Sequence, residues 1–314
     1  MRVTFNIQYL SHQQIDKAKW DDCINKATNG LVYAYSFYLD NMAKNWDALV
    51  LSKEFHSEND YDVVMPLTWN KKYDIHYLYQ PFLTAQLGVF GKTINAELVE
   101  AFLKTIPAKF KYWDISMNNE NVFDLNNFKL NQRSNFVLDL NKPYENLYKG
   151  YKENIQRNMR KAEQAGCTVQ KDFDVKKVIE LALQQMKNYT KESADNVERF
   201  RNLYQILHQK QKAITYGIVS AQNKLLASCV FFFSHNRAYY ILVGNHPDGK
   251  TVGASHALID AFIKDHAATN MILDFEGSDI PNLAFFYSSF GAIEEKYAAI
   301  KLNRLPFYLK WMKK

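Results

Sequence analysis

"LVEAFLKTIPAKFKYWDI", residues 98–115, is repeated later in the chain as "LIDAFIKDHAATNMILDF", residues 258–275. Six of the eighteen positions are identical without a gap, and four more are conservative exchanges. The identical pairs are Leu98/Leu258, Ala101/Ala261, Phe102/Phe262, Lys104/Lys264, Ala108/Ala268 and Asp114/Asp274. A shift of two residues also aligns "VMPLTW", residues 64–69, with "LASCVF", residues 226–231. Strand, strand, helix and strand therefore occur twice in the same order, which indicates an internal duplication.

The periodicity of apolar residues alternates between strand and helix spacing on both sides of the duplicated segment. We expect an α/β fold with mixed sheets of the α+β type, built as two tandem domains that the duplication relates. Pro143 interrupts regular structure, so the predicted domains are residues 1–140 and 141–314. At the N-terminus, Ser11 and Gln14 form a capping box that predicts one helix through about residue 28.

The composition is that of a soluble globular chain, with 47% hydrophobic and 23% charged residues. No apolar run has the length of a bilayer span, and the N-terminus lacks the pattern of a secretory signal, so we expect a cytoplasmic protein without a transmembrane segment. The three cysteines form no CxxC pair, which argues against disulfides and thiolate metal sites. The net charge of +6 suits an anionic substrate and is too small to indicate DNA binding.

Residues 244–251, "GNHPDGKT", have the spelling of a Walker A motif. Only about seventy residues follow, too few for the further βαβ units of a nucleotide-binding domain. The duplicate connection in the first half has no such spelling, and Pro247-Asp248-Gly249 is an ordinary turn signal. We therefore predict that this segment is not a P-loop.

Lys250 to Ser255 resemble, in a degenerate form, the Q/R-x-x-G-x-G/A loop of the GNAT acyltransferase superfamily. In that family a strand precedes the loop, a helix follows it, and backbone N–H groups bind the pyrophosphate of acyl-CoA. The resemblance implies acyl-CoA or acetyl-CoA as co-substrate. The implied contacts are Gly244, Lys250, Gly253, Ala254 and Ser255. A plain turn capped by Ser255 is the alternative interpretation.

Three longer segments follow the order seen in FemAB-like proteins, which carry two GNAT-like domains in tandem. They are "ENIQRNMRKAEQAG", "VGASHALIDAFIKD" and "DFEGSDIPNLAFFYSSFGA". The resemblance implies relatives of the peptidoglycan aminoacyltransferases. Many of those enzymes have Lys in an F-K-x-x-F-G segment, where this chain has Tyr287. A phenol can donate a hydrogen bond to an oxyanion but carries no charge, so tRNA-dependent transfer is put in doubt and acyl-CoA is favoured.

The duplication also separates candidate site residues from scaffold residues. Asp274 has the counterpart Asp114 in the first copy, which favours a structural role such as capping a strand end. Glu276 occurs only in the second copy and is a candidate general base, with a solvated loop glutamate as the alternative. Tyr287 is the second candidate catalytic residue, and packing among its phenylalanine neighbours is the alternative there.

Residues 144–166 predict one basic helix on which Lys149, Lys152, Gln156 and Arg160 share a face. Arg157, Arg160 and Lys161 are the candidate substrate-binding residues, because Arg and Lys can hold phosphate or carboxylate groups. A solvated helix face is the alternative. His256 and Asp260 have the spacing of a metal pair, but no third ligand is near in the sequence, so we predict no metal site.

These observations predict an N-acyltransferase that moves an acyl group from acyl-CoA to a small-molecule or peptidic amine, such as a cell-wall or nucleotide-linked precursor. Two alternatives stay open. One is an aminoacyl-tRNA-dependent aminoacyltransferase acting on peptidoglycan precursors, and the other is a non-catalytic GNAT-like module that binds an anionic precursor.

Overall fold

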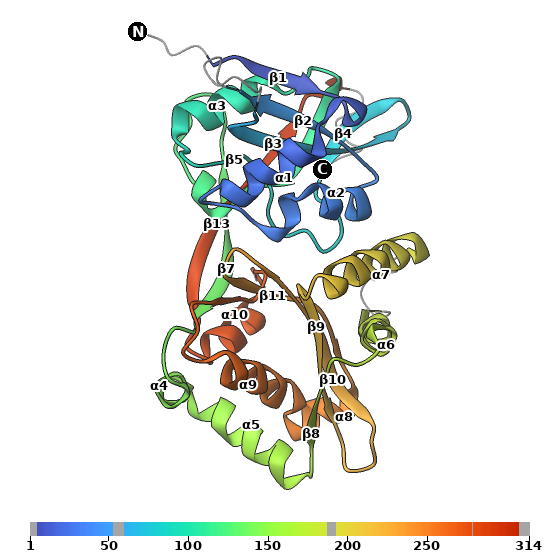
Figure 1. Ribbon diagram of the computed structural model, residues 1–314, viewed down its shortest axis with the longest axis vertical. Coiled ribbons are helices and arrows are strands. Elements are labelled where there is room, and N and C mark those ends of the chain that lie inside the picture. The colour runs from blue at the N-terminus through green and yellow to red at the C-terminus, as the bar shows by residue number, and fades with distance from the viewer. Residues whose placement is uncertain (1–4, 53–59, 187–192, 278, 308–314) are drawn as a thin grey trace. The chain divides into compact units, whose positions relative to one another are not determined.

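The computed structural model describes residues 5–52, 60–186, 193–277 and 279–307. The chain divides into two compact units, of which unit 1 comprises Met1–Arg133 with Lys296–Lys314 and unit 2 comprises Ser134–Glu295. The chain passes from one unit to the other within two strands, β7 (Asn131–Asp139) and β13 (Ile293–Asn303) (Figure 1). The units thus differ from the predicted contiguous division at residue 140, because the C-terminal strand pairs within unit 1.

Unit 1 is built on a mixed sheet in the order β1-β2-β3-β4-β6-β13. Its other strands are β1 (Ile7–Leu10), β2 (Asn45–Leu51), β3 (Val63–Lys72), β4 (Ile75–Tyr79), β5 (Phe90–Gly91, paired with β3) and β6 (Phe110–Ser116). Its helices are α1 (Lys17–Lys26), α2 (Ser36–Met42) and α3 (Ala96–Thr105). Strands β4 and β6 are parallel, so α3 serves as the crossover between them. Val99, Phe102 and Trp113 lie fully buried in the core that α3 covers.

The predicted N-terminal helix is wrong in one respect, because two separate caps divide it. Ser11 and Gln14 do form the capping box, but it closes only one 3₁₀ turn, and Ile15 is already extended. Asp16 then accepts hydrogen bonds from the backbone N–H groups of Ala18 and Lys19 and starts α1. The capping box is thus confirmed, whereas the α-helix is shorter than predicted and comprises Lys17–Lys26.

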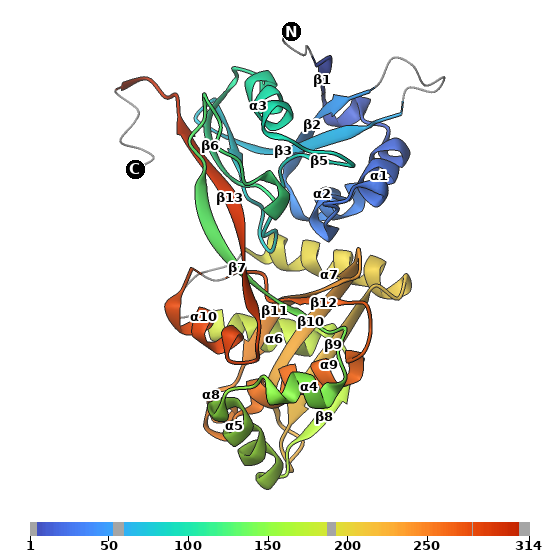
Figure 2. The ribbon, with the colours of Figure 1, turned by 90° about the vertical axis from the view of Figure 1, so that its left-hand side faces the viewer.

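Unit 2 is built on a sheet in the order β7-β12-β11-β10-β9-β8. Its strands are β8 (Thr168–Lys171), β9 (Ala213–Val219), β10 (Leu225–Ser234), β11 (Arg237–Asn245) and β12 (Ile272–Asp274), with β7 at one edge. Its helices are α4 (Tyr144–Lys149), α5 (Glu153–Gln164), α6 (Val175–Met186), α7 (Ala194–Gln209), α8 (Pro247–Val252), α9 (Ala254–His266) and α10 (Pro281–Ser288) (Figure 2).

Neighbouring residues of β10 show how this sheet is covered on both faces. Phe231 stacks on Phe262 of α9 with 3.7 Å between ring centroids, whereas Phe232 stacks on Phe200 of α7 at 5.8 Å. Successive side chains of a strand point to opposite faces, so α9 and α7 lie on opposite sides of the sheet. Both faces of β10 are therefore buried, which explains its nearly continuous apolar sequence.

The predicted duplication is visible in the fold. Segment β3-β4-α3-β6 and segment β10-β11-α9-β12 share the order strand, strand, helix and strand, with β5 inserted in the first and α8 in the second. In both, the first two strands are antiparallel and the strands flanking the helix are parallel. None of the helices in the described part of the chain combines the length and apolar character needed to cross a bilayer.

Candidate active site

Strand β12 is much shorter than β11 and pairs with only its first three residues. Arg237 to Tyr239 pair with Ile272 to Asp274, where β12 ends, while β11 continues to Asn245. The pairing of β11 with β10 skips one residue, Leu242, which has φ of 44° and forms a β-bulge. The last six residues of β11, 240–245, thus have no partner in β12, although the Asn245 N–H already donates to the Gln185 side chain.

The corresponding place in unit 1 is closed. After Tyr79, the chain is joined to the end of β6 by the side chain of Gln80, which accepts a hydrogen bond of 3.0 Å from the Ser116 N–H. The Leu87 N–H then donates to the Ser116 carbonyl at 3.0 Å. An opening between the two parallel strands is therefore a property of the second copy.

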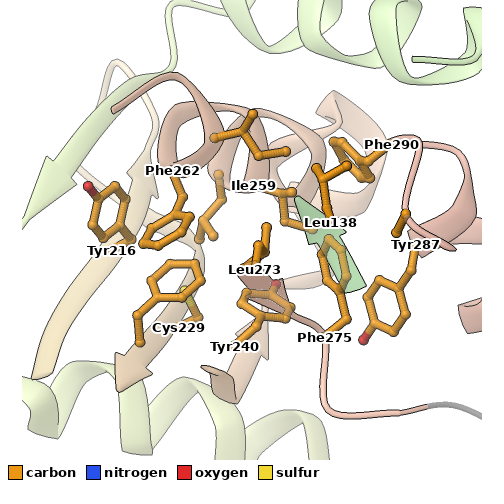
Figure 3. Packing of buried hydrophobic residues seen from close by; sticks show 14 of the residues in the cluster. Leu138, Tyr216, Cys229, Tyr240, Ile259, Phe262, Leu273, Phe275, Tyr287 and Phe290 are labelled. Atoms are coloured by element: carbon orange, nitrogen blue, oxygen red, sulfur yellow. The ribbon is translucent and has the colours of Figure 1, made fainter. Parts of the chain in front are cut away.

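Tyr240, the first residue of β11 beyond the pairing with β12, packs in one cluster with Phe275 and Tyr287 (Figure 3). The ring of Tyr287 stacks on Phe275 with 4.5 Å between centroids, and Phe275 contacts Tyr240 at 6.1 Å. Tyr287 is 8% exposed, and burial together with the charge of Glu276 raises the pKa of its hydroxyl. Of the two candidate catalytic residues, Glu276 thus lies near enough for its charge to act on the Tyr287 hydroxyl.

Glu276 lies two residues beyond the end of β12 in a left-handed backbone conformation, with φ of 61°. Its N–H donates a hydrogen bond of 2.7 Å to the Asp274 carboxylate. Asp274 in turn accepts hydrogen bonds from Arg237 at 2.6 Å and from Asn135 at 3.0 Å. Asp274 therefore caps the end of the strand, as the duplication predicts, and fixes the backbone of Glu276.

The segment with the Walker A spelling is not a P-loop. Helix α8 begins at Pro247, so Lys250 lies within the helix and not at its start. Gly249 is buried, and a Cβ atom there would lie 2.3 Å from the Leu226 carbonyl oxygen. A P-loop needs an open, phosphate-sized turn at these positions, so the structure confirms the prediction.

Lys250 lines a cavity of about 310 Å³ at the carboxyl end of β11. The other polar side chains of this cavity are Gln184, Gln185, Asn245 and His246. The Asn245 N–H donates to the Gln185 side chain at 2.6 Å, and Ser255 donates its hydroxyl hydrogen to the Asn245 side chain. Five residues were predicted to contact the acyl donor. Of these, Lys250 lines the polar pocket, and Ser255 is connected to it through its hydrogen bond to Asn245.

The other three predicted contacts are enclosed by protein. A Cβ atom on Gly244 would lie 2.6 Å from the Ala182 backbone nitrogen, so α6 occupies the space beside this glycine. Gly253 has φ of 79°, and its Cβ position lies 2.4 Å from the Asn158 carbonyl oxygen of α5. Ala254 is fully buried. In this structure the two glycines permit close helix packing.

The predicted basic helix is broken at Gly150 into α4 and α5, so the predicted shared face is wrong for Lys149, which lies on α4. Arg157, Arg160 and Lys161 all lie exposed on α5. Within the described residues, none of the three forms an ion pair. Their charges are therefore available to an anionic ligand.

His256 and Asp260 each have protein partners. The Asp260 carboxylate accepts hydrogen bonds from two tyrosine hydroxyls, and the His256 ring lies 5.0 Å from the ring of Phe286. Burial, aided by the charge of Lys161, lowers the pKa of His256 to about 4. In the described ranges, no cluster of three or more His, Cys, Asp or Glu side chains could hold a metal ion.

Residues 149–279 match the family model of the acetyltransferase (GNAT) domain. Unit 2 contains a GNAT acyltransferase domain. This stretch includes β8 to β12 and the opening between β11 and β12. A comparison with curated protein sequences finds no significant match.

Solved structures extend the likeness of fold to the whole chain, which resembles tandem GNAT proteins. FemX matches with a TM-score of 0.66 at 13% identity, over 98% of this chain and 99% of its own. A conserved protein of unknown function from Bacteroides thetaiotaomicron matches at 0.55 and 12% identity, over 95% and 99%. Saccharomyces cerevisiae N-myristoyltransferase, with bound myristoyl-CoA, matches at 0.50 and 11% identity, over 96% and 84%.

Sequence reasoning missed part of the polar pocket and the bulge. His246 caps α8 and Pro247 is its first residue, a pair that is typical of a helix start. That signal would have placed Asn245 and His246 at a strand-to-helix junction. Gln184, Gln185 and Leu242 carry no local signal, because α6 is distant in sequence and a bulge depends on pairing with β10.

Proposed function

We propose that the chain is an N-acyltransferase that takes an acyl group from an acyl-CoA and passes it to an amine. The opening between β11 and β12 carries this proposal. An extended chain with amide groups, such as the pantetheine arm of coenzyme A, can hydrogen bond to a free strand edge as an added strand would. The likeness of fold to an N-myristoyltransferase that binds myristoyl-CoA supports this choice of donor.

The proposed reaction needs a base and an oxyanion donor at the opening. The amine nitrogen attacks the thioester carbonyl, the C–N bond forms, the C–S bond breaks, and coenzyme A leaves as a thiolate that is then protonated. Glu276 would accept the proton that the attacking amine loses. The Tyr287 hydroxyl would donate a hydrogen bond to the carbonyl oxygen as it becomes negative.

The two substrates would be held by different cationic residues. Lys250, in the polar pocket at the end of β11, would bind a phosphate of the donor. Arg157, Arg160 and Lys161 on α5 would bind an anionic group of the acceptor, such as the phosphate or carboxylate of a cell-wall or nucleotide-linked precursor.

Calorimetry with acetyl-CoA and longer acyl-CoAs tests the donor. We expect micromolar binding that weakens at least tenfold in Lys250→Ala and stays unchanged in Lys177→Ala, an exposed lysine on α6. Neither ATP nor GTP should bind to the wild type or to the variants.

Failure to bind any acyl-CoA up to millimolar concentration would overturn this donor. Transfer from aminoacyl-tRNA would then support the tRNA-dependent alternative, and binding of an anionic precursor without any transfer would support the non-catalytic one. Micromolar ATP binding that is lost in Lys250→Ala would instead restore the P-loop interpretation.

A further inference from the structure

A second cavity, of about 370 Å³, lies between α5 and α9. Met159 and Ile218 contribute apolar walls, and Asp260 is one of its polar residues. Neither Glu276 nor Tyr287 lines it, and of the three residues proposed to bind the acceptor Arg160 alone does, so the proposed reacting groups lie outside this cavity.

Asp260 has an unused hydrogen-bond acceptor at this cavity. The residue is only 9% exposed, and its Oδ1 atom accepts hydrogen bonds from Tyr144 at 2.9 Å and Tyr151 at 3.0 Å. Its Oδ2 atom accepts none from any described residue. Oδ2 is not one of the buried unpartnered side-chain atoms of the described residues, so solvent reaches it, and water or a ligand in the cavity can donate a hydrogen bond to it.

The duplicated counterpart of Asp260 is Glu100, and its carboxylate is fully used. Glu100 Oε1 accepts from Lys104 Nζ at 2.6 Å and from the Asn127 side chain, and Oε2 accepts from the Asn126 N–H at 3.0 Å. Equivalent helices thus carry an acid at the same position in both units. Both carboxylate oxygens of Glu100 accept hydrogen bonds from protein groups. One carboxylate oxygen of Asp260, a residue that lines the cavity, accepts none from the described residues.

The charges around the cavity suit a ligand that carries both signs. Arg160 and Lys264 are cationic, Asp260 and Glu163 are anionic, and all four line the same cavity. Within the described residues, neither cation forms an ion pair. A simple amine would be repelled by the two cations and a simple anion by the two acids, whereas a zwitterion can satisfy both sets.

We propose that this cavity binds a small zwitterionic amine whose ammonium group donates to Asp260 and whose carboxylate lies near Arg160 and Lys264. A short apolar spacer between the two charges packs on Met159 and Ile218. Arg160 also belongs to the basic face proposed for the acceptor, so the test relies on Asp260 and on the shape of the cavity.

Calorimetry with three probes of equal length tests the charge pattern. We expect 6-aminohexanoate to bind saturably and at least tenfold more tightly than hexylamine or hexanoate, which each carry one of its charges. Asp260→Asn should weaken binding of 6-aminohexanoate at least tenfold, and the matched variant Glu100→Gln should leave it unchanged. Equal affinity for all three probes, or no binding of 6-aminohexanoate up to millimolar concentration, would overturn the proposal.

A second measurement locates the ligand and does not depend on changing a buried charge. Cys167 lines the cavity and is half-buried, whereas Cys23 and Cys229 are buried. Saturating 6-aminohexanoate should slow iodoacetamide alkylation of Cys167 severalfold. Ala257→Met, which fills the cavity, should abolish both binding and protection while circular dichroism shows a folded protein. Unchanged affinity in folded Ala257→Met would place the ligand elsewhere and refute this site.

Discussion

Arg237 donates a hydrogen bond of 2.6 Å to Asp274, and both side chains are nearly buried, with 11% and 3% of their surface exposed. The same guanidinium pairs with Glu295 at 2.9 Å. One cation thus joins β11, β12 and the first residues of β13. Asp274 also accepts a hydrogen bond from the N–H of Glu276. The ion pair with Arg237 therefore helps to fix the backbone at the candidate general base.

Replacing Arg237 with Met should destabilise the protein by about 3–5 kcal/mol, because two acids would be left in a buried site without a counter-charge. Urea unfolding of the variant measures this loss. Arg199→Met is the matched control, since Arg199 pairs with Asp195 on the surface of α7 at 2.9 Å and should cost less than about 1 kcal/mol. Equal losses in the two variants would show that burial adds nothing to the Arg237 pair.

Gly253→Ala should destabilise the protein more than Gly166→Ala. Both glycines have positive φ, at 79° and 68°, so an alanine costs about 1–2 kcal/mol at either position. Only at Gly253 would the new Cβ lie 2.4 Å from a backbone oxygen; at Gly166 the nearest atom is 3.5 Å away. Thermal unfolding should therefore show a clearly larger loss for Gly253→Ala. Similar losses would mean that α5 can move away from α9 without cost.

The duplication could be predicted because each copy carries local signals in the same order. Leu98 and Phe102, like Leu258 and Phe262, recur at helical spacing, and each helix covers its own sheet. Asp274 could be assigned a capping role because its counterpart survives in the first copy. These inferences need only neighbours in sequence or comparison of two segments.

What the sequence could not show depends on contacts between distant segments. Gly253 matches a loop motif, but only the packing of Asn158 against it reveals that the glycine allows two helices to meet. Strands β7 and β13 each run from one unit into the other. This arrangement depends on pairing between strands that are far apart in the sequence, which no local pattern encodes. Gly150 ends α4 in a helix-like conformation, so the break before α5 was not visible in the periodicity.

His256 should make stability depend on pH. Its pKa is about 4 in the folded protein, against 6.5 for an unperturbed histidine, because burial disfavours the charged ring. As pH falls from 7 to 4, the unfolded chain takes up the proton first, so the folded state loses stability, on the order of 2 kcal/mol. The His256→Gln variant lacks this titrating group. Its free energy of unfolding relative to wild type should therefore rise as the pH falls from 7 to 4. A constant difference in urea unfolding free energy from pH 7 to 4 would refute this coupling.

Arg157→Ala and Arg160→Ala should weaken binding of the acceptor and leave donor affinity unchanged. Each charge-assisted contact contributes about 1.5–3 kcal/mol, so KM for the acceptor should rise at least tenfold. Steady-state kinetics with the donor held saturating measures this. Lys149→Ala is the control, because Lys149 is an exposed cation that the structure places on α4. An unchanged acceptor KM in both arginine variants would show that this face is merely solvated.

Tyr287→Phe distinguishes an active-site tyrosine from a packed one. The ring stacks on Phe275 and stays buried in either case, so the variant should keep its fold and unfold at nearly the wild-type temperature. If the hydroxyl hydrogen bonds to the developing oxyanion, its removal should lower kcat by about ten- to a thousandfold while donor affinity barely changes, because that bond matters mainly in the transition state. Tyr287→Lys should not restore the rate, since burial among aromatic rings disfavours a charged amine. Wild-type kcat in Tyr287→Phe would remove the residue from the reaction. New aminoacyl-tRNA activity in Tyr287→Lys would instead show that the pocket still accepts the donor of the peptidoglycan aminoacyltransferases.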